Sequence, residues 1–315
     1  FKIHTDKRPR MVVFNSGLKV PSNLKIQKSV SDLKYQLINA PNVLDRIWAA
    51  QQLSKKKGRK IVEYALLESA KEDSFWAVRS EAYSSLGKLK TKANQEDFQW
   101  IKNNEKDNRV KRSFIRSLRH QLNDDNVSRF LEDIIISDTS YYSIADAIRI
   151  LSVADSSKAK DHVIKLLNTE SHNDVIRKSA LSYYGQVKTM SNYNRLKELA
   201  QYGKFSWASR STIIYELSKY QKTRPKTYDY ILSFFDDEDR FVRMAVIAQI
   251  GNYGNESNYG LLDEMVEKDP VLSINSRRAK AKIQKRKNSV SKKSKTQTVE
   301  QLNKKINAIK NILLD

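Results

Sequence analysis

The side chains best suited to binding chemistry in this sequence are basic ones at a regular spacing. Most are arginines, which bind carboxylates and phosphates through a planar fork of N–H donors. They recur at positions 46, 79, 111, 177, 210 and 243, while position 144 of the series holds isoleucine. Such a series could line a basic surface for an acidic ligand, a peptide carboxyl terminus or nucleic acid. With nearby cations, the candidate interaction surface comprises Arg79, Lys111, Arg112, Arg177, Lys178, Arg210 and Arg243.

The same series has an architectural interpretation. The cations could pair with carboxylates of adjoining turns, such as Asp45, Glu81 and Asp174, and so orient one repeat on the next. We favour this interpretation, because a position that recurs regularly is first a packing position. Arg116 and Arg119 add further charge nearby. Three tryptophans share the spacing, which favours packing over base stacking: Trp48, Trp76 and Trp207.

Residues for catalysis or metal binding are sparse. The chain has no cysteine, which excludes disulfides and thiolate metal sites, and no two of its four histidines are spaced i, i+4. Glycine-rich phosphate loops and the Gly-x-Ser-x-Gly pattern are also missing. We interpret the acidic run at 236–239 as a solvated helix cap rather than a cation site. We therefore predict no catalytic, cofactor-binding or metal-binding residue in this chain.

The elements that must position the cations follow from the same period. Small or apolar residues lie three positions after each member of the series, and apolar or aromatic residues lie seven positions after it. Helical spacing inside a unit of about 33 residues is typical of stacked helix pairs that share one core. We predict an all-α fold, a HEAT/ARM-like α-solenoid of about eight helix pairs over residues 29–287. The eighth and last repeat matches the pattern less well and contains Ser276, Ala279 and Ile283.

Helix starts can be placed within each unit. Four residues before six of the seven series positions lies a residue that can cap a helix through a side-chain oxygen, whereas the seventh is Phe75. The six are Asn42, Asp107, Ser140, Asn173, Ser206 and Asp239. Outer helices are expected at 32–40, 60–70, 96–103, 127–136, 159–167, 193–202, 227–235 and 259–267.

Both ends of the chain depart from the repeat. Residues 1–28 contain short β-type runs at 2–5 and 11–14, which predict a short β segment, the remnant of an upstream β-sandwich. Residues 277–295 hold ten lysines and arginines and no acid, and 288–297 are predicted to be a basic linker. In residues 298–315, successive apolar residues are separated by 3, 4, 3 and 4 positions and follow a capping box. This spacing predicts an amphipathic capping helix on the last repeats, or else a coiled coil with another chain.

The overall charge limits the kinds of partner. Lysine and arginine total 58 against 36 acidic residues, a formal net charge of +22, which suggests an acidic partner or only good solubility. No apolar run approaches the ~18 residues that a membrane helix needs, and no signal-peptide pattern opens the chain. We expect no membrane partner and a cytoplasmic location.

Two segments near the start of the chain resemble a known family. They are residues 11–20, Met-Val-Val-Phe-Asn-Ser-Gly-Leu-Lys-Val, and residues 36–53, Gln-Leu-Ile-Asn-Ala-Pro-Asn-Val-Leu-Asp-Arg-Ile-Trp-Ala-Ala-Gln-Gln-Leu. Together they look like the junction in aminopeptidase-N-type zinc metallopeptidases, where a small β-sandwich leads into a HEAT-like helical domain. The resemblance covers about residues 1–56. Asn15 and Ser16 stand where that family usually has Asp-Pro before the glycine.

The resemblance implies a non-catalytic C-terminal domain that covers the peptide cavity and controls access to the active site. The family's His-Glu-x-x-His and Gly-x-Met-Glu-Asn motifs are missing here, so zinc is expected only in an upstream catalytic domain. The implied partners are the upstream metallopeptidase domains of the same polypeptide and a peptide substrate, and the parent protein could be a zinc aminopeptidase. The alternative is a basic HEAT-like scaffold or binding module for protein or nucleic acid, with steeply salt-dependent binding in the nucleic-acid case.

Overall fold

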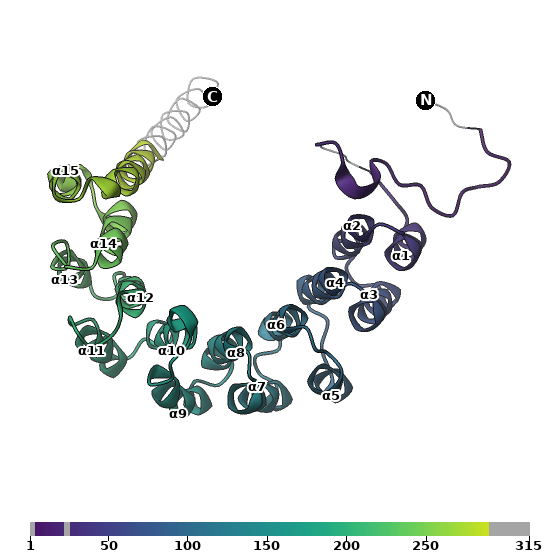
Figure 1. The fold of residues 1–315 in the computed structure, drawn as a ribbon, viewed down its shortest axis with the longest axis horizontal. Coiled ribbons are helices and arrows are strands. Elements are labelled where there is room, and N and C mark those ends of the chain that lie inside the picture. Colours follow the sequence, from purple (N-terminus) through teal and green to yellow (C-terminus); the bar gives the residue numbers. More distant parts are fainter. Residues whose placement is uncertain (1–3, 22–25, 290–315) are drawn as a thin grey trace, which may run out of the picture. The chain divides into compact units, whose positions relative to one another are not determined.

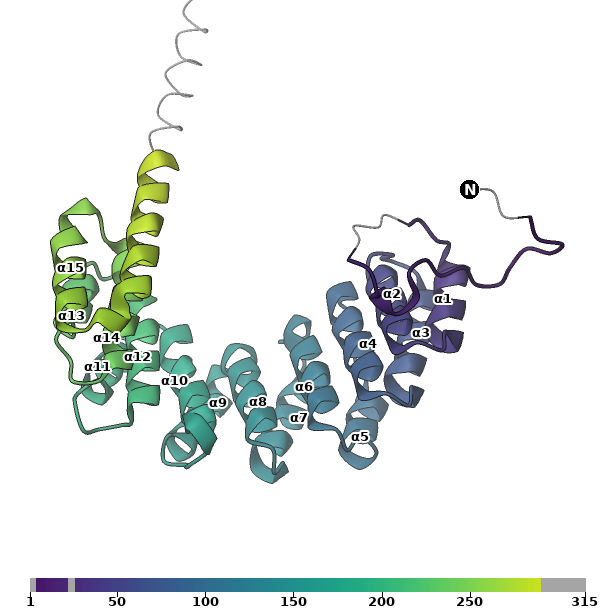
Figure 2. The same cartoon turned by 45° about the horizontal axis from the view of Figure 1, so that its top comes forward.

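A computed structural model describes residues 4–21 and 26–289 of the chain. Within these residues the secondary structure is helical, with α-helices and short 3-10 turns and no strand. The helices follow one another in antiparallel pairs, as Figures 1 and 2 show. The chain divides into two compact units, with the boundary between Val187 and Lys188. The predicted all-α solenoid of HEAT-like repeats is confirmed.

The first unit contains two layers of helices. Its outer helices are α1 (Val30–Asn39), α3 (Lys60–Glu72), α5 (Gln95–Asn103), α7 (Asp125–Ser137) and α9 (Ser156–Leu167). Its inner helices are α2 (Val43–Leu53), α4 (Trp76–Leu89), α6 (Asn108–Ser117), α8 (Tyr141–Ala154) and α10 (Val175–Gln186). Each inner helix packs on its outer partner or on the neighbouring inner helices, as α4, α6 and α8 do in sequence. Three-residue 3-10 turns lie at Ser16–Leu18, Leu118–His120 and His172–Asp174.

The second unit repeats this arrangement. Its outer helices are α11 (Met190–Leu199), α13 (Thr227–Leu232) and α15 (Tyr259–Lys268), and its inner helices are α12 (Trp207–Ser218) and α14 (Arg240–Tyr253). After 3-10 turns at Glu256–Asn258 and Pro270–Leu272, a further helix covers residues 273–289. In this helix Ser276, Ala279 and Ile283 are buried, as expected for the eighth repeat.

The core of each unit lies between the layers and is built from the two apolar positions of the repeat. Every residue three positions after the repeat cation is buried, from Ala49 to Val246. The residues seven positions after it are buried as well, including Leu53, Leu118 and Ile250. These positions lie on one helical face, so each repeat contributes a strip of apolar surface to the core of its unit.

The predicted helix caps are only partly formed. Asn42, Asp107 and Ser140 accept backbone N–H bonds at the starts of α2, α6 and α8. Ser206 and Asp239 occupy the N-cap positions of α12 and α14, but their side chains do not cap the helix. The prediction for Asn173 is wrong: it lies in the 3-10 turn before α10, and the cap position falls on Asp174, which is itself left-handed with φ 54°. The left-handed conformation of Asn173 and Asp174 therefore shifts the start of that helix by one residue.

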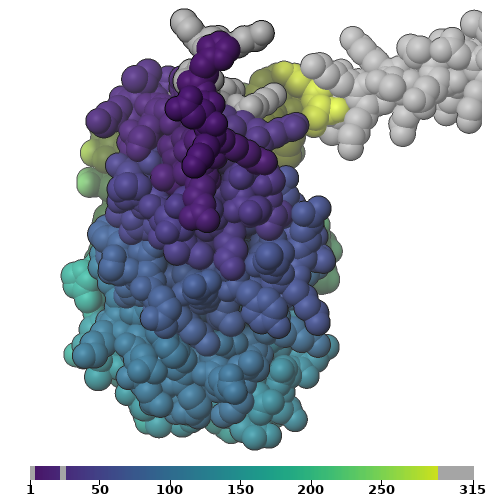
Figure 3. Space-filling view, turned by 90° about the vertical axis from the view of Figure 1, so that its right-hand side faces the viewer, coloured from purple at the N-terminus to yellow at the C-terminus, as the bar shows by residue number. Residues whose placement is uncertain are grey.

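The amino-terminal segment contains no strand in its described residues, so the predicted β segment is not formed there. Asn15 and Leu18 adopt left-handed backbone conformations, and Gly17 has φ 74°, which breaks an extended run into a turn. The segment lies on the first helix pair instead (Figure 3). Both Ser16 and the Gly17 N–H donate to the carboxylate of Asp45, so polar contacts to α2 replace a sheet partner.

The carboxyl-terminal predictions lie mostly outside the described residues. The helix over 273–289 includes Asn288 and Ser289, the first two residues of the expected basic linker. Residues 290–297 of that linker and the predicted capping helix at 298–315 are not described by the structure.

Candidate functional site

The repeat cations connect neighbouring repeats through ion pairs. With the exception of Arg177, each pairs with a carboxylate in the turn between the two helices of the next repeat. We call these pairs the ladder. Its rungs are Arg46–Asp73, Arg79–Glu105 and Lys111–Asp138 in the first unit, and Arg210–Asp237 and Arg243–Asp269 in the second. The ladder supports the architectural interpretation of the series.

The Arg79–Glu105 rung shows how an ion pair of the ladder connects two successive repeats. Arg79 donates to Glu105 through Nε and Nη2 at 2.9 and 3.0 Å, and its Nη1 donates to the carbonyl of Asp73 at 2.9 Å. Glu105 also accepts the backbone N–H of Asp107 at 2.8 Å, just before α6. This hydrogen bonding to Glu105 raises the pKa of Arg79. A single guanidinium therefore ties the turn of its own repeat to the turn of the next.

The exceptions follow the same register. Where the cation is replaced, at Ile144, no ion pair can form, and the corresponding turn of the next repeat holds Glu170 and Ser171. Arg177 pairs with Asp174 of its own repeat at 2.6 Å, as the sequence suggested. The other two suggested acids act elsewhere, because Asp45 binds the amino-terminal segment and Glu81 pairs with Lys88.

The seven residues of the predicted interaction surface lie in different settings. Four are ladder cations with mostly buried side chains: Arg79, Lys111, Arg210 and Arg243. Arg177 is similarly covered, and Lys178 is partly buried on α10. Ligand contact by the ladder cations stays a prediction, and a ligand there would have to compete with their ion pairs. Arg112 differs, because it belongs to a cluster outside the ladder.

The arginine cluster consists of Arg112, Arg116 and Arg149 around one carboxylate, that of Asp146. The arginine nitrogens lie 2.8, 2.9 and 3.6 Å from its oxygens. Arg112 and Arg116 are one helical turn apart on α6, and Asp146 and Arg149 are spaced i, i+3 on α8. Asp146 is 5% exposed, whereas Arg116 and Arg149 are 46% and 47% exposed. The cluster thus carries three positive charges against one buried negative charge.

The cluster retains hydrogen-bonding capacity for an anion. Each guanidinium has five N–H donors, whereas a carboxylate offers only about four acceptor sites in all. The remaining donors therefore need other acceptors. The ring of Tyr142 lies beneath Arg112, with the guanidinium carbon 4.7 Å from the ring centre. This stacking and the shared Asp146 hold the arginines in place before any ligand arrives.

At two repeat positions of the first unit, the positive charge is concentrated on α6 and α8. Arg112 and Arg116 lie one and five positions after the repeat cation. The equivalent residues are Ile47 and Gln51 on α2, Ser80 and Ser84 on α4, and Lys178 and Ser182 on α10. Only one of these six is charged. The arrangement therefore suits a short anionic group better than a long one.

Only part of this cluster was predicted from the sequence. Arg112 was among the predicted surface residues and Arg116 among the nearby charges, whereas Arg149 and Asp146 were not predicted. A signal was present, because Asp146 lies one repeat further along the chain than Arg112 and one helical turn before Arg149. In the described residues no group of three potential metal ligands is found, and no helix among them is long and apolar enough to cross a membrane.

Comparisons with known proteins add a general likeness. No family model and no curated protein matches the chain. Among solved structures, the complex of CpcE and CpcF of phycocyanin lyase from Nostoc sp. PCC7120 is 12% identical, with a TM-score of 0.47, over 79% of this chain and 98% of that chain. Human deoxyhypusine hydroxylase in complex with glycerol is 13% identical, with a TM-score of 0.36, over 81% of this chain and 96% of that one. At these scores the likeness carries no functional argument.

Proposed function

We propose that the chain is a HEAT-like scaffold module that binds an acidic peptide segment of a partner protein at the arginine cluster. The observation that carries the proposal is the sharing of one buried carboxylate, that of Asp146, by three arginines. Two positive charges of the cluster are left without a carboxylate of the cluster to balance them. Glutamate or aspartate side chains match the forked geometry of the arginines and supply that charge.

The energetics favour this site over the ladder. A ligand at the ladder would have to replace carboxylates that are already buried and ion-paired, which costs desolvation without a net gain. In the cluster the arginines share an acceptor, so a second carboxylate adds hydrogen bonds without breaking the first set. A ligand also reaches half-exposed cations at a lower free-energy cost than buried ones, because less of the surrounding protein must move.

The concentration of this charge on two adjacent helices favours a peptide over nucleic acid. Nucleic-acid affinity grows with the number of phosphates neutralised, which requires a basic track over several repeats. Outside α6 and α8, the equivalent inner-layer positions of the first unit hold one cation, Lys178. A peptide with two or three acidic residues needs contact with only two adjacent helices.

Fluorescence anisotropy with a labelled glutamate-rich peptide tests the proposal. The double variant Arg116→Gln/Arg149→Gln should weaken binding by about tenfold or more, because each lost charged hydrogen bond is worth about 1.5–3 kcal/mol. The matched control is Arg195→Gln, whose arginine is 44% exposed and paired with Glu198 on α11, and it should leave affinity unchanged. Equal affinity of the wild type and the double variant would refute the site. Preferential, steeply salt-dependent binding of DNA would favour nucleic acid instead.

The amino-terminal segment favours a second candidate, the C-terminal domain of an aminopeptidase-N-type protein. Its turn is fixed to Asp45, while Val12, Phe14, Leu18 and Val20 remain exposed. An anchored turn with outward apolar side chains is what a junction with another domain would provide. The polypeptide encoded together with its upstream sequence should then bind zinc and hydrolyse aminoacyl-p-nitroanilides. If it does neither, this candidate is excluded.

A further inference from the structure

The arginine cluster contains N–H donors that no group in the described residues accepts. Arg112 donates to Asp146 through Nε at 2.8 Å, and Arg116 donates to it through Nη2 at 3.3 Å. Arg149 lies 3.6 Å from the same carboxylate, which is too far for a hydrogen bond. In the part of the chain that the structure describes, the other guanidinium N–H groups of these three arginines have no acceptor.

These unused donors are accessible and close together. The side chains of Arg116 and Arg149 are 46% and 47% exposed, whereas that of Asp146 is 5% exposed. All three guanidiniums approach one carboxylate, at distances from 2.8 to 3.6 Å, so their N–H groups converge on one small area. A compact anion can therefore contact Arg116 and Arg149 together without reaching Asp146.

The helices on either side of α6 and α8 leave the charge of the cluster unbalanced. On α4, the position equivalent to Asp146 holds Glu81, which pairs with Lys88 of the same helix at 3.1 Å. On α10, the positions equivalent to Asp146 and to the third arginine are serines, Ser179 and Ser182. The excess of positive charge therefore stays at the cluster.

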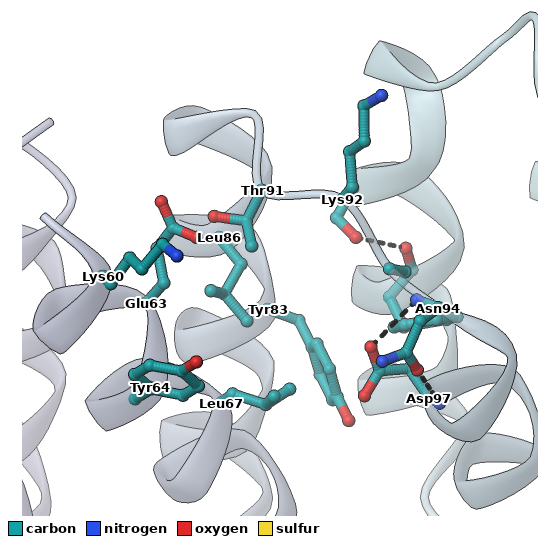
Figure 4. A pocket seen from close by; sticks show the side chains of 13 residues that line it. Lys60, Glu63, Tyr64, Leu67, Tyr83, Leu86, Thr91, Lys92, Asn94 and Asp97 are labelled. Carbon is teal, nitrogen blue, oxygen red and sulfur yellow. Dashed lines mark hydrogen bonds between the residues drawn. The ribbon is translucent and has the colours of Figure 1, made fainter. Parts of the chain in front are cut away.

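The cavity between α3, α4 and the loop that leads into α5 is less suited to an anion (Figure 4). It has a volume of about 220 Å³, and its lining includes Lys60 and Lys92 together with Glu63 and Asp97. Positive and negative charges are equal in number there, and Asp97 also pairs with Lys71 at 2.8 Å. An anion in this cavity would meet carboxylates as well as ammonium groups, whereas the exposed charges of the cluster are all positive.

A phosphate group matches the cluster better than a single carboxylate does. The phosphate of a phosphoserine carries a charge of about −1.5 to −2 at pH 7 and has three strong acceptor oxygens. Three arginines and one aspartate leave two positive charges in one place. One phosphate can balance both charges and accept from two forked guanidiniums, whereas carboxylates can do so only as two side chains brought together.

We propose that the acidic segment bound at the cluster contains a phosphoserine or phosphothreonine, whose phosphate binds Arg116 and Arg149 together. This inference rests on the proposed function and specifies the ligand of the same site. Recognition of the partner then depends on its phosphorylation, because the unmodified hydroxyl side chain carries no charge.

Fluorescence anisotropy with the whole chain tests the proposal with three labelled peptides of the sequence Glu-Glu-X-Glu-Glu, in which X is phosphoserine, glutamate or serine. The wild type should bind the phosphoserine peptide about tenfold more tightly than the glutamate peptide, because the phosphate accepts additional charged hydrogen bonds. Affinity for the phosphoserine peptide should fall from about pH 7.5 to about pH 5.5, as the phosphate takes up a proton with a pKa of about 6. Affinity for the glutamate peptide should change little over this range, because glutamate has a pKa of about 4.3.

Two double variants separate charge from geometry. Arg116→Gln/Arg149→Gln should abolish the preference for phosphoserine over glutamate. Arg116→Lys/Arg149→Lys keeps the charge but lacks the forked donors, so it should bind both peptides with a smaller preference than the wild type. The control Arg195→Gln, whose arginine pairs with Glu198 on α11, should keep the full preference.

The outcomes distinguish this inference from the proposed function. Equal affinity of the wild type for the phosphoserine and glutamate peptides, or a full preference for phosphoserine in either double variant, would overturn the phosphate site. The acidic-peptide site would still stand if the glutamate peptide bound the wild type and lost affinity in the glutamine double variant. If none of the three peptides binds the wild type, both proposals are overturned.

Discussion

At the scale of single residues, the position within the repeat decides what an arginine does. Arg79 occupies the repeat position, where its side chain is 16% exposed and forks onto Glu105. Arg116, five positions beyond the repeat cation of its own helix, is 46% exposed and shares Asp146 with two other arginines. In the first setting all three guanidinium nitrogens donate to the protein, whereas in the second the arginines share one acceptor and, as we propose, have donors left for a ligand. The same residue type therefore serves architecture in one place and, as we propose, recognition in the other.

Replacing a ladder arginine should destabilise the first unit strongly. Arg79→Met leaves Glu105, which is 2% exposed, without its partner, and removal of one member of a buried pair costs about 3–5 kcal/mol. The double variant Arg79→Met/Glu105→Gln should recover part of this loss, because no buried charge remains. Urea unfolding measures both. A loss below about 1 kcal/mol for Arg79→Met, the range of an exposed pair, would contradict the structural role.

The stability of the second unit should depend on pH through Asp269. The hydrogen bond from Arg240, followed by that from Arg243, holds the pKa of Asp269 below its ordinary value. A lowered folded-state pKa gives stability that is complete above the unfolded pKa of about 3.9 and is lost as pH falls through the lower folded value. The Asp269→Asn variant should therefore be less stable than the wild type at pH 7. Below about pH 4, its free energy of unfolding should fall less steeply with decreasing pH than that of the wild type. Urea denaturation at a series of pH values from 2 to 7 measures this. The same pH dependence below pH 4 in both proteins would show that the ion pairs of Asp269 contribute nothing.

At the scale of elements, the period of the sequence predicted the helices, but it did not predict every end. Helix pairs and core positions follow from apolar spacing, which is local and recurs in every repeat. The start of α10 does not follow from this spacing, because the left-handed residues Asn173 and Asp174 displace the N-cap by one residue. The strands expected near Val12 failed for another reason. A short β-type run needs a partner strand, and in the described residues the segment finds polar contacts with α2 instead.

Helix packing gives a prediction that opposes helix propensity. A Cβ added at Gly87 of α4 would lie 3.0 Å from the Cα and Cβ atoms of Ser117, so the two inner helices approach closely there. Gly87→Ala should therefore destabilise by about 1–3 kcal/mol, the usual cost of overpacking, although alanine is the better helix former. Gly260→Ala in α15 meets no atom within 4 Å and should be neutral or stabilising by up to about 1 kcal/mol. Thermal unfolding of both variants checks the contrast, and stabilisation by both would contradict the close approach.

At the scale of the whole molecule, both partners of the ladder recur in the sequence. The carboxylates of the ladder recur with the same period as the cations, at Asp73, Glu105, Asp138, Asp237 and Asp269, so the pairing could have been found by searching both signs of charge. The arginine cluster is harder, because it joins positions one repeat apart on adjacent helices.

The ladder arginines and the cluster arginines have separate roles in this proposal, and one pair of variants distinguishes those roles. Affinity for the glutamate-rich peptide and free energy of unfolding are measured for Arg79→Gln and for Arg116→Gln. The ladder variant should lose stability by several kcal/mol and keep its affinity at temperatures where it is folded. The cluster variant should keep its stability and lose affinity about tenfold. Separate roles would be ruled out if the cluster variant bound as tightly as the wild type, or if the ladder variant lost affinity without losing stability.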